Sequence, residues 1–72
     1  MTKRKTLIRA LRRAARARGM EFILARQGAN HEVYKLGGLM IPIPRHTEID
    51  DRLADRICDE AEAKLGKGWK RP

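Results

Sequence analysis

Two histidines are the side chains of this sequence that titrate near neutral pH, His31 and His46. The stretch 28–30 before His31 contains glycine and asparagine, so we expect a turn to present this histidine beside a closely approaching backbone. His46 follows Pro44 and Arg45, in a second stretch that we expect to be a loop. A lone histidine is more often a surface or hydrogen-bonded structural residue, and that alternative stays open for both.

Residue types and spacing exclude several chemistries. Cys58 is the single cysteine, and the two histidines do not form a helical His-x-x-x-His pair, so no metal site is expected. The chain contains no serine, and the glycines at 37–38 are not followed by the Lys-Ser/Thr of a P-loop. RNA cleavage remains possible, because RNA supplies its own nucleophile, the 2′-hydroxyl, and needs only a base and cations. No cofactor is therefore expected.

The distribution of charge favours a polyanionic ligand. Lysine and arginine number 17 against nine acidic residues, which gives a net charge of +8. Residues 1–20 contain eight of the bases and no acid, whereas residues 48–62 contain seven of the nine acids. This asymmetry predicts one surface for nucleic acid and a different surface for something else, with a merely solvated basic surface as the alternative.

The apolar periodicity predicts an amphipathic helix over residues 5–18, ended by Gly19. Its apolar arc consists of Leu7, Ile8, Leu11, Ala14 and Ala15, and the opposite arc of Lys5, Arg9, Arg12, Arg13 and Arg16. This basic arc is a candidate phosphate-contacting surface.

Three strands and a second helix are expected to follow. The strands are predicted over 21–26, with Phe22 and Leu24 on one face, then over 31–36 and 39–43, with turns at 27–30 and 37–38. Pro42 indicates an edge strand or a bulge. The second helix is expected to begin at Thr47 or Asp50 and to end at Gly66. The basic tail 67–72 is expected to be flexible unless something binds it.

These elements predict one α+β domain over residues 1–72, in the order α-β-β-β-α, with an antiparallel three-stranded sheet and both helices on one face. This is the arrangement of double-stranded-RNA-binding domains. No apolar run approaches the length of a membrane span, and arginines interrupt the stretch 7–18 that a secretory signal would need to be apolar. We therefore expect a cytoplasmic protein that does not enter a membrane.

Two motifs, taken in order, resemble the HicA toxins of HicA/HicB toxin–antitoxin systems. They are Gly-Ala-Asn-His-Glu-Val-Tyr over 28–34 and Ile-Pro-Ile-Pro-Arg-His-Thr-Glu-Ile over 41–49, and the resemblance extends from Lys5 to Gly66. It implies a small toxin that cleaves mRNA on a double-stranded-RNA-binding-like fold and is silenced by a HicB antitoxin. The implied catalytic residue is His31. Ala29 stands where the family has a serine, which removes a hydroxyl contact to phosphate.

The expected ligands are RNA and a HicB-like antitoxin. The residues expected to bind RNA lie on the basic helix arc, on the strands and in the loops, and they are Arg9, Arg12, Arg16, Arg26, Gly28, Asn30, Lys35, Arg45 and His46. The antitoxin is expected to be acidic and to bury His31. The main alternative is a non-catalytic RNA-binding module on the same fold. A helix-turn-helix DNA-binding protein fits less well, because strands separate the two helices.

Overall fold

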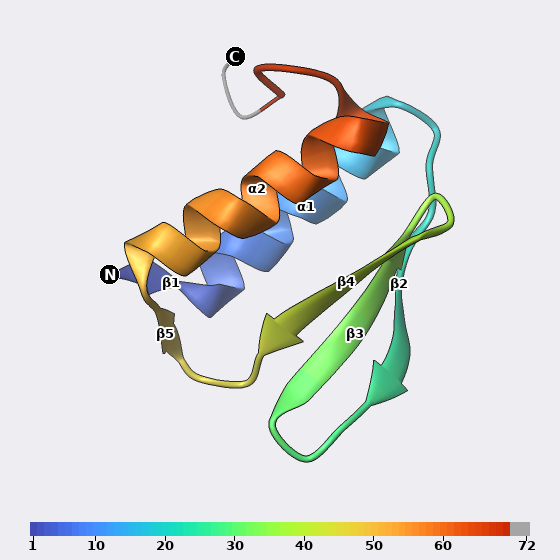
Figure 1. Cartoon of the computed structure of the whole chain (residues 1–72). Helices are drawn as coiled ribbons and strands as arrows, with labels where there is room; N and C mark the ends of the chain where they lie inside the picture. Colours follow the sequence, from blue (N-terminus) through green and yellow to red (C-terminus); the bar gives the residue numbers. More distant parts are fainter. Residues whose placement is uncertain (70–72) are drawn as a thin grey trace.

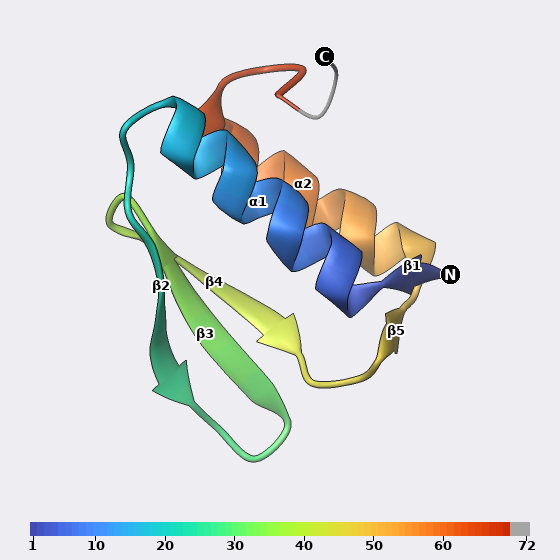
Figure 2. The ribbon, with the colours of Figure 1, turned by 180° about the vertical axis from the view of Figure 1, so that it is seen from behind.

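The computed structural model describes residues 1–69 and has the predicted α+β fold, with two helices and a three-stranded antiparallel sheet in the order α-β-β-β-α. The elements are β1 (Thr2–Lys3), α1 (Arg4–Ala17), β2 (Phe22–Gln27), β3 (His31–Leu36), β4 (Leu39–Pro44), β5 (Glu48–Ile49) and α2 (Asp51–Leu65). The two helices lie side by side over one face of the sheet, and the β2–β3 hairpin projects beyond them (Figures 1 and 2).

Both helices begin and end within a few residues of the predicted positions. The predicted apolar arc of α1 is buried, and its basic arc is exposed. Of the two predicted caps of α2, Asp50 is the correct one, since its Oδ1 accepts a hydrogen bond from the Arg52 N–H at 3.1 Å. The ends of the helices are joined by Arg18, whose guanidinium donates to the carbonyl oxygens of Leu65 (2.6 Å) and Ala14 (3.0 Å). Arg18 therefore stabilises the carboxyl ends of both helices.

The sheet has the strand order β2-β3-β4. The predicted turn at Gly37 and Gly38 is confirmed, with φ values of 54° and 101° that suit a two-residue hairpin. Strand β4 is an edge strand, as Pro42 indicated. The prediction that Phe22 and Leu24 share one face of β2 is confirmed, since they lie opposite Leu36 and Tyr34, although Phe22 is buried and Leu24 is 40% exposed. The register shifts between Leu24 and Arg26, and this half of the hairpin extends past the helices.

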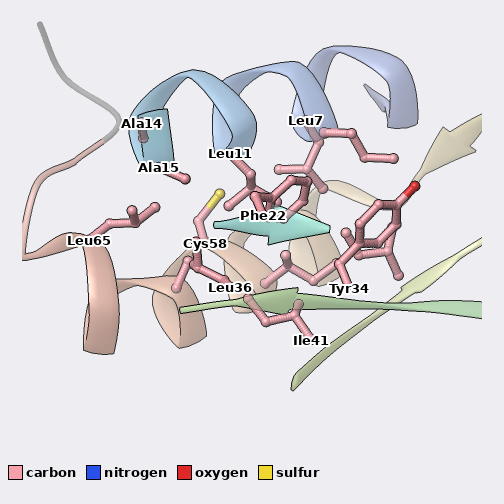
Figure 3. Close-up of a cluster of buried hydrophobic side chains, with 14 of the residues drawn as sticks. Leu7, Leu11, Ala14, Ala15, Phe22, Tyr34, Leu36, Ile41, Cys58 and Leu65 are labelled. Atoms are coloured by element: carbon pink, nitrogen blue, oxygen red, sulfur yellow. The ribbon is translucent and has the colours of Figure 1, made fainter. Parts of the chain in front are cut away.

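One aliphatic core joins the two helices to the sheet (Figure 3). Its largest fully buried side chains are Leu11, Leu36, Ile41, Ile43 and Ile49. The rings of Phe22 and Tyr34 stack at 4.9 Å between centroids, with 5° between their planes, at one edge of this core. Along β3, side chains that point to the helices alternate with side chains that point away from them.

Two packing features were not predicted. The short strands β1 and β5 pair antiparallel and hold the beginnings of the two helices together. Trp69, expected in a flexible tail, is only 9% exposed, and its indole N–H donates to the carbonyl oxygen of Cys58 at 3.0 Å. The ring belongs to the buried core and, with Leu7, Ala54 and Cys58, lines an apolar hollow, so burial of the ring outweighs the entropy of the tail up to this residue. The rest of the predicted tail, 70–72, lies outside the described residues.

Within residues 1–69, no helix has the length and apolar character needed to cross a membrane.

Candidate nucleic-acid interface

A basic groove lies between the first half of α1 and the end of the sheet, with a volume of about 510 Å³. We call it the arginine groove. It is lined by Arg4, Lys5, Ile8, Arg9, Arg12, Tyr34, Arg45 and Thr47. Three of the predicted RNA-binding residues, Arg9, Arg12 and Arg45, are therefore brought together. Five cationic side chains in one open groove create a strongly positive potential, which attracts a phosphate backbone.

Arg4 fixes α1 to the sheet at the bottom of this groove. Its Nε donates to the carbonyl oxygen of Pro44 at 2.7 Å, and its NH2 group donates to Glu32. Tyr34 also donates to Glu32, through its hydroxyl, at 3.2 Å. Partial burial raises the pKa of Glu32, but the hydrogen bonds from Arg4 and Tyr34 and the charges of Arg4 and Arg45 outweigh it, so that the pKa lies below its usual value. Glu32 is thus ionised, and it neutralises one of the five cations.

The basic side chains continue along α1 beyond the groove. Arg16 lines two further shallow hollows together with Arg12. The Arg12 guanidinium carbon lies 5.7 Å from the centre of the Phe22 ring, which in turn stacks on Tyr34. This cation–π contact holds Arg12 against the edge of the core without using its hydrogen-bond donors. Arg12 therefore keeps its donors available for phosphate while its position is fixed.

The β2–β3 loop presents His31 at the open end of the sheet. His31 is exposed, and it lies opposite Pro44 in the β3–β4 register. Two backbone hydrogen bonds hold the loop: the Gly28 N–H donates to the His31 carbonyl at 2.8 Å, and the Arg45 N–H donates to the Asn30 carbonyl at 3.2 Å. A Cβ on Gly28 would lie 3.0 Å from the His31 oxygen, so this close approach favours glycine. Neither Gly28 nor Asn30 has a positive φ, so the loop does not use the left-handed conformation that both residue types tolerate.

The remaining predicted site residues do not line the arginine groove. Arg26 and Lys35 lie on what we call the outer face, the side of strands β2–β4 that points away from the helices. Alternation along β3 places His31 on this face too, together with Lys35, whereas Tyr34 points toward the helices. His46 is exposed in the β4–β5 loop, next to Arg45 in the chain. The predicted residues therefore divide between two surfaces that meet at His31 and Arg45.

Lys5, which also lines the groove, belongs to the basic arc that the sequence indicated as a phosphate-contacting surface. Sequence reasoning missed three residues of the groove as ligand-binding candidates: Arg4, Tyr34 and Thr47. These three reach the groove through tertiary contacts that no local pattern contains. Among residues 1–69, no three His, Cys, Asp or Glu side chains gather in a way that would hold a metal ion.

No protein-family model, curated protein or solved structure matches this chain.

Proposed function

We propose that this chain is a HicA-like toxin, an endoribonuclease that cleaves mRNA in the cytoplasm without a metal or cofactor and is held inactive by a HicB-like antitoxin. The observation that supports it best is the connection between the arginine groove and His31. Arg45 lines the groove, and its N–H is bonded to the carbonyl of Asn30, the residue before His31. A base and a set of phosphate-binding cations thus meet at one edge of the sheet.

The proposed reaction uses the nucleophile of the RNA itself. His31 accepts the proton of a ribose 2′-hydroxyl, and the 2′-oxygen attacks the neighbouring phosphorus. The bond from phosphorus to the 5′-oxygen breaks, and this oxygen takes a proton from water. The products carry a 2′,3′-cyclic phosphate and a 5′-hydroxyl. Arg45 stabilises the negative charge that develops on the phosphorane, and Arg9 and Arg12 hold the adjoining strand.

The second candidate function is RNA binding without cleavage. Two observations favour it: His31 lies on the outer face rather than inside the arginine groove, and Ala29 offers no hydroxyl to a phosphate. For cleavage, the RNA strand has to pass from the groove over Arg45 to reach His31. For binding alone, the groove is sufficient.

The experiment that separates the two functions compares wild type with His31→Ala, in cells and with purified protein and RNA in the presence of a chelator. His31→Ala is expected to abolish growth inhibition and to lower the cleavage rate by about 10²–10⁴-fold, the usual contribution of a general base, while RNA affinity stays the same. Arg56→Ala, on the exposed side of α2, is the matched control for an unrelated surface change.

The chemical nature of the ends provides an independent check. Wild-type products should carry a 2′,3′-cyclic phosphate, or the monophosphate from its opening, and a 5′-hydroxyl. A folded His31→Ala variant that cleaves RNA as fast as wild type would contradict the role of His31. RNA that binds to wild type but stays intact would favour the binding module, and 5′-phosphate ends or a strict requirement for magnesium would contradict the 2′-hydroxyl mechanism.

A further inference from the structure

The basic side chains of α1 form a continuous row along the helix. Four exposed cations follow one another at intervals of four, three and four residues, which places them on one side of the helix: Lys5, Arg9, Arg12 and Arg16. Neither α1 nor the residues before it include an acid, so nothing within the helix neutralises them. With the usual rise of an α-helix, the four positions extend over about 16 Å. We call them the basic row.

His31 lies near one end of this row. Strand β4 ends beside the start of α1 (Figures 1 and 2), where the Arg4 Nε donates to the Pro44 carbonyl at 2.7 Å. Pro44 lies opposite His31 in the sheet. At the other end of the row, Arg16 lines a hollow together with Phe22, at the start of β2. The row therefore leads away from the proposed catalytic histidine in one direction, along α1.

The surface in the opposite direction repels a phosphate backbone. Beyond Arg45, the chain enters β5 and the first turn of α2. This segment exposes three carboxylates, those of Glu48, Asp50 and Asp51. An RNA strand that continued past Arg45 in this direction would bring its phosphates to like charges.

The outer face of the sheet also offers RNA less than the basic row does. Ile23 and Met40 are each 48% exposed there, and apolar side chains do not bind a phosphate. Lys35 lies between them in the strand registers, but it pairs with Glu21 at 3.8 Å. A strand that crossed onto this face would therefore exchange four cations for Arg26 and a lysine that is already paired.

We propose that one strand of the RNA runs along the basic row and that its contacts end at His31, so that the chain holds its substrate on one side of the cleavage position. The proposal rests on the proposed function, because it describes how the substrate lies in that same site. The length of the row matches about three to five nucleotides, at about 3.4 Å or more for each. Arg16, at the end of the row, is then reached only by substrates with that many nucleotides on the held side.

Oligonucleotides with one ribonucleotide in a DNA strand test the proposal, because the single 2′-hydroxyl fixes the cleavage position. Three substrates have about five nucleotides on the 5′ side and one on the 3′ side, the reverse, or about five on both sides, each with all four bases at the ribose. The value of kcat/KM is measured for wild type, for Arg16→Gln and for Arg56→Gln, which removes the same charge from the exposed side of α2. Circular dichroism confirms that each variant is folded.

One of the two asymmetric substrates should be cleaved within about threefold of the symmetric one, and the other about tenfold or more slowly. Arg16→Gln should lower kcat/KM about three- to tenfold at about 50 mM salt for the symmetric and the better asymmetric substrate, and should leave the poorer one unchanged. Arg56→Gln should change none of them. Equal rates for the two asymmetric substrates, or an effect of Arg16→Gln that is the same for all three, would overturn the proposal.

RNA affinity decides the path of the strand whether or not the substrates are cleaved. Fluorescence anisotropy with a labelled RNA of about eight nucleotides is measured in the His31→Ala background. Arg16→Gln should lower the affinity about three- to tenfold at about 50 mM salt. A fall as large for Arg26→Gln, which reports on the outer face, would place RNA on both surfaces and overturn the proposal. A wild-type chain that cleaves no RNA, with an affinity that falls for Arg16→Gln and not for Arg26→Gln, would refute the endoribonuclease and leave the path along the basic row standing.

Discussion

The arginine groove makes a quantitative prediction about the salt dependence of RNA binding. The perturbation is the triple substitution Arg9→Gln, Arg12→Gln and Arg45→Gln, made together with His31→Ala so that RNA is not consumed. Glutamine keeps much of the length and polarity of arginine and removes the charge. The three arginines lie in exposed positions, so the fold should survive.

The magnitude follows from the lining of the groove. Five of the lining side chains are cationic, and Arg4 is already paired with Glu32, which leaves four for phosphates. Each phosphate contact contributes about 0.7–0.9 to the slope of log affinity against log salt, so the slope should be about −3 to −3.5. Affinity should then fall about 50- to 150-fold between 50 and 200 mM salt. With Lys5 alone remaining, the fall should be about threefold.

Fluorescence anisotropy with a short labelled RNA, repeated over a series of salt concentrations, measures the slope. The charge-matched control is Arg52→Gln, Arg56→Gln and Lys67→Gln, all exposed and all on or after α2. This control removes the same net charge from a surface that we do not assign to RNA, so its slope should stay near that of the parent. Equal slopes for the two triple variants would show that RNA responds to net charge alone, and the reasoning from the groove would be refuted.

Two further predictions concern stability. Trp69→Phe removes the indole hydrogen bond to Cys58 and should lower the melting temperature by about 4–8 °C, for a loss of about 1 kcal/mol of unfolding free energy. Trp69→Ala should lower the unfolding free energy by about 3 kcal/mol or more. Circular dichroism measures both melting temperatures, and wild-type values for both variants would mean that the ring is not docked. Glu32→Gln should lower the melting temperature at pH 7, and the gap to wild type should narrow as the pH falls below 4.5, the ordinary pKa of a glutamate, because a carboxylate with a lowered pKa stabilises the fold only while it is ionised. A gap that is constant or widens in acid would contradict the Glu32 assignment.

Local patterns were sufficient for the main elements of the fold. The helical arcs of α1, the glycine pair at 37–38 and the proline at 42 each have a direct physical meaning, and the structure confirms the helix, the hairpin and the edge strand that they predicted. The pattern failed where a tertiary contact decided the outcome. Trp69 follows two glycines in a basic tail, and nothing local reveals that its ring joins the buried core and bonds to the Cys58 carbonyl of α2.

The candidate site could be predicted only as a set of residue types. The basic arc of α1 and the loop histidine were visible, but their separation onto two sides of the sheet depends on side-chain alternation and on where the helices pack. The sequence also gave no reason to distinguish Arg4 from its neighbours. Its importance arises from Glu32 and Pro44, which lie far away in the chain and reach Arg4 only in the folded protein.

Arg4 also explains how a histidine on a hairpin end can have a defined position relative to the arginine groove. Chemistry of the proposed kind is sensitive to displacements of about 1 Å, so a mobile loop would be a poor carrier of the base. Here one guanidinium is bonded to Glu32, the neighbour of His31 in the chain, and to Pro44, its neighbour across the sheet. The same residue is the first of α1, the helix that carries the groove arginines. The helix that we propose to bind phosphate and the histidine that we propose as the base are thereby joined through a single side chain, so an RNA strand held by α1 would also stand in a fixed relation to His31.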